Sequence, residues 1–465
     1  MGISEPVLVS PEAFVAAMTA RWCDLGNTPS PRLQQLWRTI AIAFAEAITS
    51  RDQKWRVLQP PTGTGKTQGL CVYSALTITK NLSSLTPIGI LVVTRTIQQA
   101  NEIVDTIREL IPGDAADRVQ TKHSENKISI FAMDAADVLV VTHAAYTLAL
   151  EELYAEENGR WSNYTHWQHG PRRLTIIDEA LSGVVEENQV RGEAVRQVLG
   201  CINAELRLRF PGPVSALEAI QNVLHKIDIR SAIARSKGEA IAPKRVVWSA
   251  VDEGRVEFPA VYSMGPLREA MAGLPYDRML LRKNSSADRA RIAQRTDETL
   301  QSCEAIMKRW AFYYQKGKEA TLNSSQLLIP DDLPGPVVLD ATATQNFLWP
   351  LLGPRAVIMP IPEGSRNYGN VNLHVARVSA GLGKGKMQDS GKTRLPRLLA
   401  ELERQLPPDR KVLLCLHKDI KHIALSYCPN FATYSVANWG AIDGKNDWED
   451  HDIAVIFGMP YRDEI

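Results

Sequence analysis

The feature that most constrains this chain is a glycine-rich segment, PTGTGKT, at residues 61–67. The apolar run at residues 55–59 precedes it and a helix-compatible run follows it, so the order is strand, loop, helix. A polyphosphate needs backbone N–H groups, a helix N-terminus and one mobile cation, and this order supplies all three. We therefore predict that residues 61–67 form a phosphate loop. Pro60 stands where the usual pattern has glycine or alanine, which is a departure from it.

The phosphate loop predicts a nucleotide site with ATP and Mg²⁺ as cofactors. Lys66 would reach the β- and γ-phosphates, and the Thr67 hydroxyl would ligate Mg²⁺. The glycines would let the backbone approach the phosphates closely. The residues expected to contact the nucleotide here are Thr62, Gly63, Thr64, Gly65, Lys66 and Thr67.

A second motif, TIIDEA at residues 175–180, places two adjacent carboxylates at the end of an apolar strand. Asp178 would hold Mg²⁺ through water, and Glu179 would orient or deprotonate the attacking water. A solvated surface pair is the common alternative, but the upstream phosphate loop favours the functional interpretation. Lys66, Asp178 and Glu179 are therefore the expected catalytic residues, with Thr67 and Asp178 at the metal.

The pattern of apolar runs predicts an α/β fold. Short β-branched runs at 88–93, 138–141 and 174–177 are typical of strands buried on both faces of a parallel sheet, and helical stretches such as 31–50 and 98–110 alternate with them. We assign residues 1–185 to an N-terminal helix and a first lobe, completed by a strand within 336–345.

The rest of the chain predicts two further parts. Residues 186–335 are expected to form a largely helical insertion, with helices at 194–208, 214–227 and 286–314. Residues 346–465 are expected to form a second α/β lobe, itself incomplete, with strands near 411–416 and 453–457.

Composition limits the partners and the compartment. With 53 Lys and Arg against 52 Asp and Glu, the net charge is +1, so any nucleic-acid contact must be local. The six cysteines are scattered and predict reduced thiols rather than a zinc site or a disulfide framework. Neither a signal peptide nor a membrane-length apolar run is recognisable, so we expect a cytoplasmic protein without a membrane partner.

Taken together, the motifs resemble those of superfamily 2 helicases, the DEAD/DEAH-like group. The phosphate loop, the Asp-Glu-Ala box and Ala341-Thr342-Ala343 resemble its motifs I, II and III. Residues 93–99 (VTRTIQQ) and 136–144 (ADVLVVTHA) resemble segments of the branch that contains the iron–sulfur DNA helicases of excision-repair type. Near the end, residues 440–448 and 456–460 resemble motif V and its following strand.

The resemblance implies two RecA-like lobes with ATP between them and a single strand, expected to be DNA, as partner. It implies that Thr94, Arg95 and Thr142 contact the strand's phosphodiester backbone. The upstream pair Arg32 and Gln35 is similar to the adenine-reading Q motif. From the residues alone, Arg95 is equally well a solvated charge at a helix start, and His143 is more often a satisfied core histidine.

Three departures from that family pattern matter. Only Cys71 lies between motifs I and II, where the iron–sulfur members place four cysteines, so we expect no iron–sulfur cluster. Leu181 stands where His or Asp usually follows the Asp-Glu-Ala box, which puts the coupling of hydrolysis to movement in doubt. The Q-x-x-G-R-x-x-R element with the arginine finger is not found before Ile465, so we expect a missing C-terminal segment or a partner protein to supply that arginine.

These observations predict an ATP-dependent helicase or translocase. One alternative is an ATP-binding, nucleic-acid-binding protein without autonomous motor activity; the missing arginine element favours it. Another is a P-loop switch ATPase unrelated to nucleic acid; the Thr-Arg-Thr segment and the second lobe argue against it.

Overall fold

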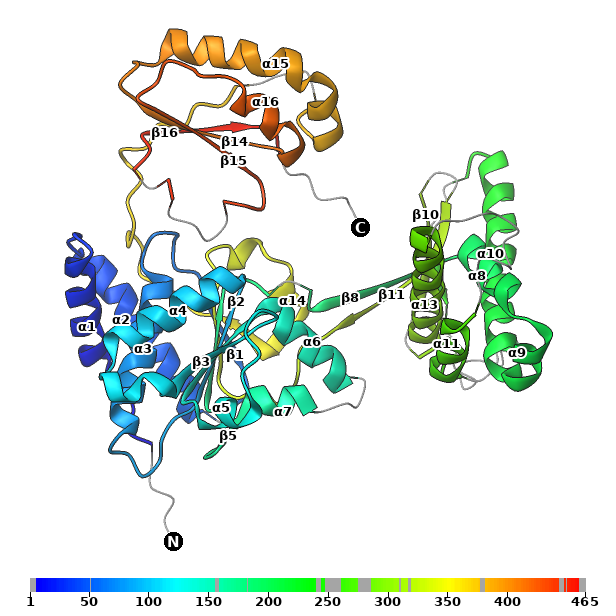
Figure 1. Ribbon diagram of the computed structural model, residues 1–465, viewed down its shortest axis with the longest axis horizontal. Coiled ribbons are helices and arrows are strands. Elements are labelled where there is room, and N and C mark those ends of the chain that lie inside the picture. The colour runs from blue at the N-terminus through cyan, green and yellow to red at the C-terminus, as the bar shows by residue number, and fades with distance from the viewer. Residues whose placement is uncertain are drawn as a thin grey trace. The chain divides into compact units, whose positions relative to one another are not determined.

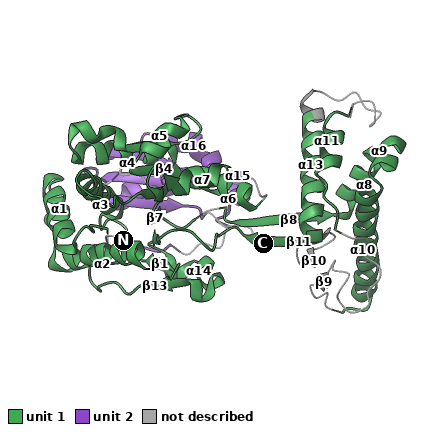
Figure 2. Cartoon of the chain, turned by 90° about the horizontal axis from the view of Figure 1, so that it is seen from below, with its two compact units in different colours: residues 1–366 green, residues 367–465 purple. Residues whose placement is uncertain are grey.

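The computed structural model describes most of the chain and divides it into two compact units (Figure 2). Unit 1 is Met1–Arg366 and unit 2 is Asn367–Ile465. The described residues are 6–50, 52–154, 159–181, 183–239, 244–246, 261–274, 286–308, 311–316, 319–376, 381–442, 447–448 and 450–459.

A seven-stranded sheet, counted over the described residues, forms the centre of unit 1, and all its strand pairs are parallel (Figure 1). The strand order is β13-β1-β12-β7-β2-β4-β3. The strands are β1 (Trp55–Leu58), β2 (Ile90–Thr94), β3 (Val119–Lys122), β4 (Val138–Thr142), β7 (Leu174–Asp178), β12 (Pro336–Leu339) and β13 (Ala356–Ile358). The apolar runs predicted all of these strands except β3 and β13, so the parallel α/β fold of the first lobe is confirmed.

Both faces of this sheet are covered, which explains why its strands are apolar at successive positions. In β2, Ile90 and Val92 face one core. Leu91 and Val93 face the other core. Helices on the first face are α1 (Pro11–Asp24), α2 (Pro31–Thr49), α3 (Lys66–Asn81) and α4 (Ile97–Leu110). Helices on the second face are α5 (Ile130–Ala135), α6 (His143–Tyr154), α7 (Gly159–Thr165) and α14 (Leu348–Leu351).

Helices α1 and α2 begin with the same serine–proline signal. The Ser10 hydroxyl accepts the backbone N–H of Ala13 at 3.2 Å, and the Ser30 hydroxyl accepts that of Leu33 at 3.1 Å. Proline suits the first helical position because its missing N–H has no partner to lose there. The sequence analysis found α2 by its periodicity but did not find α1, although the same start signal precedes it.

The segment between β7 and β12 forms an insertion with its own core. Within the described part of the insertion, an antiparallel sheet has the order β8-β11-β10-β9, and β8 and β11 run side by side (Figure 1). Its strands are β8 (Val185–Arg191), β9 (Lys244–Val246), β10 (Ala311–Lys316) and β11 (Glu319–Leu327). Its helices are α8 (Gly192–Cys201), α9 (Ala204–Arg209), α10 (Pro211–Ser236), α11 (Gly265–Ala272) and α13 (Ser286–Lys308).

The insertion differs from the sequence expectation at two points. The helix expected over 286–314 is wrong beyond Lys308, because 311–316 form the strand β10. Tyr313 is buried and Tyr314 is exposed, which is the two-residue alternation of a strand. The helix expected over 194–208 is divided into α8 and α9. The insertion is therefore largely helical but also contains an antiparallel sheet.

Unit 2 is a second, smaller α/β body with its own core, formed mainly by α15 and β14. Among its described residues, three parallel strands have the order β15-β14-β16. Its elements are α15 (Lys384–Gln405), β14 (Lys411–Leu416), α16 (Lys421–Leu425), β15 (Thr433–Asn438) and β16 (Ile453–Phe457). The strands expected near 411–416 and 453–457 are confirmed, whereas the motif V positions 443–446 and Pro460 lie outside the described residues.

The remaining elements are short. They are η1 (Gly113–Arg118), β5 (His166–Trp167), β6 (Gly170–Pro171), η2 (Ala343–Gln345), η3 (Gly353–Arg355) and η4 (Lys418–Ile420). None of the helices that the structure describes combines the length and the apolar character that a membrane span needs.

A buried arginine, Arg172, joins the segment before β7 to its neighbours. Its side chain is almost inaccessible, and burial lowers its pKa to about 9 against the opposing effect of nearby carboxylates. Its guanidinium donates hydrogen bonds of 2.9–3.3 Å to the backbone carbonyls of Ile90, Met133, Ala136, Asp137 and Tyr164. One charged side chain thus fixes the starts of β2, β4 and β7, whose other ends carry the candidate site.

We expect Arg172→Met to lower the free energy of unfolding by roughly 3 kcal/mol, because buried carbonyls lose charge-assisted donors. The measurement is urea unfolding followed by circular dichroism. The neighbouring Arg173→Met, at a half-buried position, is the matched control and should change stability by less than about 1 kcal/mol. Equal effects of the two substitutions would contradict this role of Arg172.

Candidate functional site

The phosphate loop leaves the carboxyl end of β1 and enters α3 at Lys66. Gly63 and Gly65 have φ angles of 77° and 81°, in the left-handed region that glycine adopts at little cost. Any other residue would be strained at both positions. The loop therefore curves around the N-terminus of α3, where backbone N–H groups and the helix dipole favour an anion.

Side chains from outside the phosphate loop hold its shape. The Trp37 indole Nε1 donates to the Thr64 carbonyl at 2.9 Å, and the Thr64 hydroxyl donates to the Pro61 carbonyl at 2.7 Å. Trp37 is fully buried in the core beneath the loop. The loop geometry thus depends on α2 as well as on its own glycines.

Asp178 lies at the end of β7, directly beside the start of α3. Its Oδ2 accepts hydrogen bonds from the Thr67 hydroxyl at 3.1 Å and from Gln99 Nε2 at 3.0 Å. The side chain is 1% exposed. The pKa of Asp178 is raised to about 6, mainly by burial and also by the nearby Glu179, against the opposing effects of Lys66 and of the Thr67 hydrogen bond. The phosphate loop and the Asp-Glu pair, far apart in sequence, are therefore directly bonded.

The residues around Asp178 fit a divalent cation. Asp178 Oδ1 is buried and has no hydrogen-bond partner among the described residues. Mg²⁺ prefers oxygen ligands and is usually held by one or two protein groups together with nucleotide phosphates. Thr67 and Asp178 are the residues that would hold it. No cluster of three or more His, Cys, Asp or Glu suited to a metal occurs in the part of the chain that the structure describes.

Glu179 combines an unusual backbone with an ion pair. Its φ is 68°, a left-handed conformation that costs a non-glycine residue about 1–3 kcal/mol. Its N–H donates to the Leu339 carbonyl at 3.2 Å, which ties this conformation to β12. Its carboxylate lies 3.5 Å from Arg95 Nη1, and the two side chains are 35% and 46% exposed. The turn therefore directs the carboxylate towards the end of β2 and keeps it accessible.

The other two residues expected to contact a nucleic-acid strand are more deeply buried than Arg95. Thr94 and Thr142 are register partners at the ends of β2 and β4, and both are buried. The Thr142 hydroxyl accepts the backbone N–H of Ala145 at 3.2 Å and so caps α6. Of the three residues, Arg95 alone presents an accessible polar group.

His143 is buried between β4 and the Asp-Glu pair. Its Nε2 lies 3.1 Å from the backbone carbonyl oxygen of Asp178. Burial lowers its pKa to about 4, so the imidazole is neutral at pH 7. It thus packs as a core histidine that also supports the backbone at Asp178.

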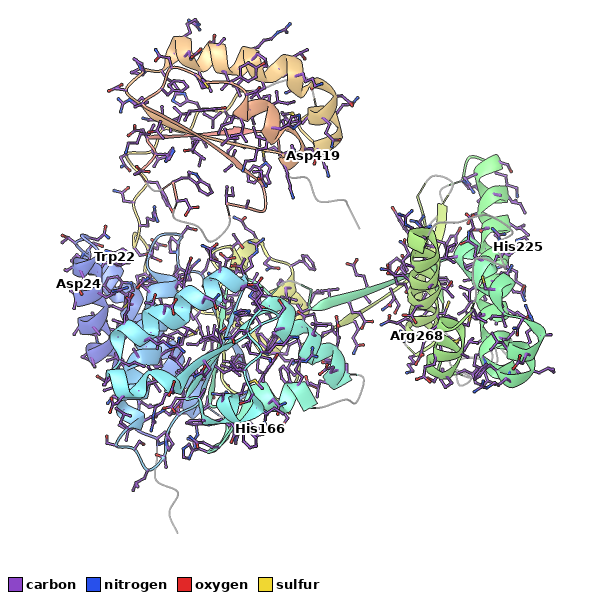
Figure 3. All side chains as sticks on the ribbon, viewed as in Figure 1. Trp22, Asp24, His166, His225, Arg268 and Asp419 are labelled. Atoms are coloured by element: carbon purple, nitrogen blue, oxygen red, sulfur yellow. The ribbon has the colours of Figure 1, made fainter. Side chains whose placement is uncertain are left out.

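Gln35 and Arg32 lie on the first turn of α2, and Arg32 Nη1 donates to Gln35 Oε1 at 3.2 Å. A residue that the sequence analysis missed is Trp22, near the end of α1 (Figure 3). Its ring packs edge-on against Trp37 with 5.5 Å between centroids, and a Cβ at Gly65 would clash with it. The Ser10–Pro11 start of α1 was the signal that would have found it.

Ala341-Thr342-Ala343 follows β12 and forms a tight turn around Asp340. The Thr342 backbone N–H and hydroxyl both donate to Asp340 Oδ1 at 2.8 Å, and Trp349 Nε1 donates to Oδ2 at 3.0 Å. The Thr344 N–H donates to Gln59 Oε1 at 3.3 Å, next to the phosphate loop. This segment therefore borders the loop at the same sheet edge.

Comparison with known proteins gives structural similarity to helicases at low identity. No family model and no curated protein matches the chain. The chain is similar to S. tokodaii Xpd4, with 15% identity and a TM-score of 0.38 over 91% of this chain and 83% of that one. It is also similar to a hypothetical ATP-dependent RNA helicase from Sulfolobus tokodaii (19%, TM-score 0.22, 36% and 41% covered) and to the UvsW helicase from bacteriophage T4 (13%, TM-score 0.23, 41% and 56% covered).

The chain spans less than two thirds of the length of the last two structures. With identities and TM-scores this low, the roles of individual residues rest on the chain's own chemistry.

The raised pKa of Asp178 predicts a trade-off between stability and ligand binding. Its pKa of about 6 in the folded chain exceeds the value near 4 of an unfolded aspartate. The free energy of unfolding therefore decreases as the pH rises from about 4 to about 6. Asp178→Asn should therefore raise the melting temperature of the ligand-free protein at pH 8, and raise it less at pH 5. The same variant should lose Mg²⁺-dependent nucleotide binding. Thermal melts at both pH values test the first part, and an equal shift at both would contradict it.

Proposed function

We propose that this chain is an ATPase that couples ATP hydrolysis to movement along one nucleic-acid strand, as a superfamily 2-type helicase or translocase, with single-stranded DNA as the expected strand. The observation that carries the proposal is the ion pair of 3.5 Å between Glu179 and Arg95. Glu179 is the candidate that orients or deprotonates the attacking water, and Arg95 is the accessible candidate for binding the nucleic-acid strand. A contact between them gives a direct physical link between hydrolysis and the strand.

In this proposal the residues of the nucleotide site have distinct roles. The backbone N–H groups of the phosphate loop and the Lys66 ammonium bind phosphate oxygens. The Thr67 hydroxyl would ligate Mg²⁺ and Asp178 would hold it through water. Bound MgATP would supply the labile phosphoanhydride, and its Mg²⁺ would neutralise charge on the phosphates. Glu179 orients the attacking water and accepts its proton.

Strand binding would act on Glu179 through Arg95. A half-exposed ion pair is worth only about 0–1 kcal/mol, so another anion can replace the glutamate at low cost. A phosphodiester backbone offers Arg95 a succession of such anions, and the planar guanidinium matches their geometry. When Arg95 turns to the strand, Glu179 is released towards the water. Because the chain carries a net charge of only +1, we expect this contact to be local and sensitive to salt.

The proposal predicts separate effects for Lys66→Ala and Arg95→Ala. Lys66→Ala should lower ATP turnover by about 100-fold or more with or without a strand, because transition-state charge loses its cation. Arg95→Ala should keep basal turnover measurable but reduce its stimulation by single-stranded DNA about tenfold, because the exchange of anions is lost. The measurement is steady-state phosphate release with oligo-dT, oligo-rU and no strand.

Arg38→Ala is the matched control for Arg95→Ala. The Arg38 side chain is also 46% exposed and is also paired with a glutamate, Glu12, on α1. It should leave the stimulation unchanged. If no strand raises wild-type turnover and none binds at low salt, the motor proposal fails and an ATPase unrelated to nucleic acid is favoured. If oligo-rU stimulates and oligo-dT does not, the DNA assignment is wrong.

A further inference from the structure

A second basic side chain reaches the phosphate loop from a segment that none of the sequence motifs covers. Arg366, the last residue of unit 1, donates a hydrogen bond to the backbone carbonyl of Thr62. Its guanidinium also lies against Gly63, so that a Cβ at position 63 would clash with it. The phosphate loop is thus flanked by Lys66 from α3 and by Arg366 from the segment that follows β13.

Sheet topology explains why Arg366 reaches this position. β13 pairs in parallel with β1, and the Met359 N–H continues the ladder to the Val57 carbonyl at 2.8 Å. The chain therefore leaves β13 at the same sheet edge where the phosphate loop leaves β1. Met359 and Ile361 pack against the first core, and Ser365 is buried. The segment is anchored along its length and delivers Arg366 to the mouth of the loop.

We propose that Arg366 is a ligand of the nucleotide's polyphosphate, which rests on the nucleotide site of the proposed function. An arginine fork binds phosphate oxygens in a bidentate way, and these bonds between opposite charges are stronger than the bond from the guanidinium to a neutral carbonyl. The Thr62 carbonyl then serves as the resting partner of the guanidinium. Arg366 is distinct from the arginine of the Q-x-x-G-R-x-x-R element, because it lies in the first unit beside the loop itself.

The test measures binding of two probes, AMP-PNP and inorganic tripolyphosphate, by isothermal titration with Mg²⁺ at low salt. Arg366→Ala should weaken both probes by about tenfold or more, because both lose the same charged contact. Arg366→Lys should recover part of the affinity through its charge. Arg366→Gln, which keeps an N–H donor for the Thr62 carbonyl but has no charge, should bind like Arg366→Ala.

Two outcomes would overturn the inference. Wild-type affinity in Arg366→Gln would show that the side chain only supports the loop through Thr62. Weakened AMP-PNP with unchanged tripolyphosphate would place the side chain at the nucleoside instead. Arg397→Ala, at an exposed arginine on α15, is the charge-matched control and should bind both probes like the wild type. Thermal melts of each variant confirm that the fold is kept.

The same titrations separate this inference from the proposed function. If the wild type does not bind AMP-PNP, or if Lys66→Ala binds it equally well, the nucleotide site itself is wrong. If Lys66→Ala loses binding and Arg366→Ala does not, the nucleotide site stands and only the role of Arg366 is wrong.

Discussion

The candidate site depends on one buried carboxylate. Asp178 Oδ2 accepts bonds from Thr67 and Gln99, while Oδ1 is buried without a partner among the described residues. Burying a carboxylate in this way is unfavourable, as its raised pKa indicates, and it is tolerated where a ligand or cation completes the shell. The buried Asp178 thus lowers the stability of the ligand-free chain but leaves a carboxylate oxygen available to a cation.

The parallel sheet brings the other parts of the site to that carboxylate. β1, β12, β7 and β2 are neighbours in the sheet, and all their carboxyl ends lie at one edge. Segments separated by more than 250 residues, from the phosphate loop to Thr342 and Arg366, therefore meet there. Arg172 fixes the opposite ends of β7 and β2, and of their neighbour β4, so the geometry of the site depends on packing far from it.

The sequence was sufficient for the features that depend on local pattern. Apolar runs predicted the central strands because burial on both faces requires apolar side chains at successive positions. The sequence was insufficient where pairing between strands far apart in the chain determines the structure. β10 has a helix-compatible sequence and becomes a strand through its pairing with β9 and β11. Arg366 lies in no motif, and its place beside the loop follows only from the pairing of β13 with β1. The roles of Thr94, Arg95 and Thr142 stay predictions.

The site contains a buried part around Asp178 and an exposed part whose charged side chains can change partners. This difference matters for the role of Leu181. Leu181, the residue after the Asp-Glu-Ala box, is buried, and its apolar side chain has no polar atom to interact with the site. Asp178 is buried and its partners Thr67 and Gln99 are half-buried, so breaking their hydrogen bonds would leave a buried carboxylate unpaired at high cost. Arg95 and Arg366 are accessible, and the acceptors they contact, the Glu179 carboxylate and the Thr62 carbonyl, are groups that a phosphate oxygen can replace. In the proposed motor, coupling between the nucleic-acid strand and the nucleotide would therefore pass through these exposed charges rather than through the Leu181 side chain.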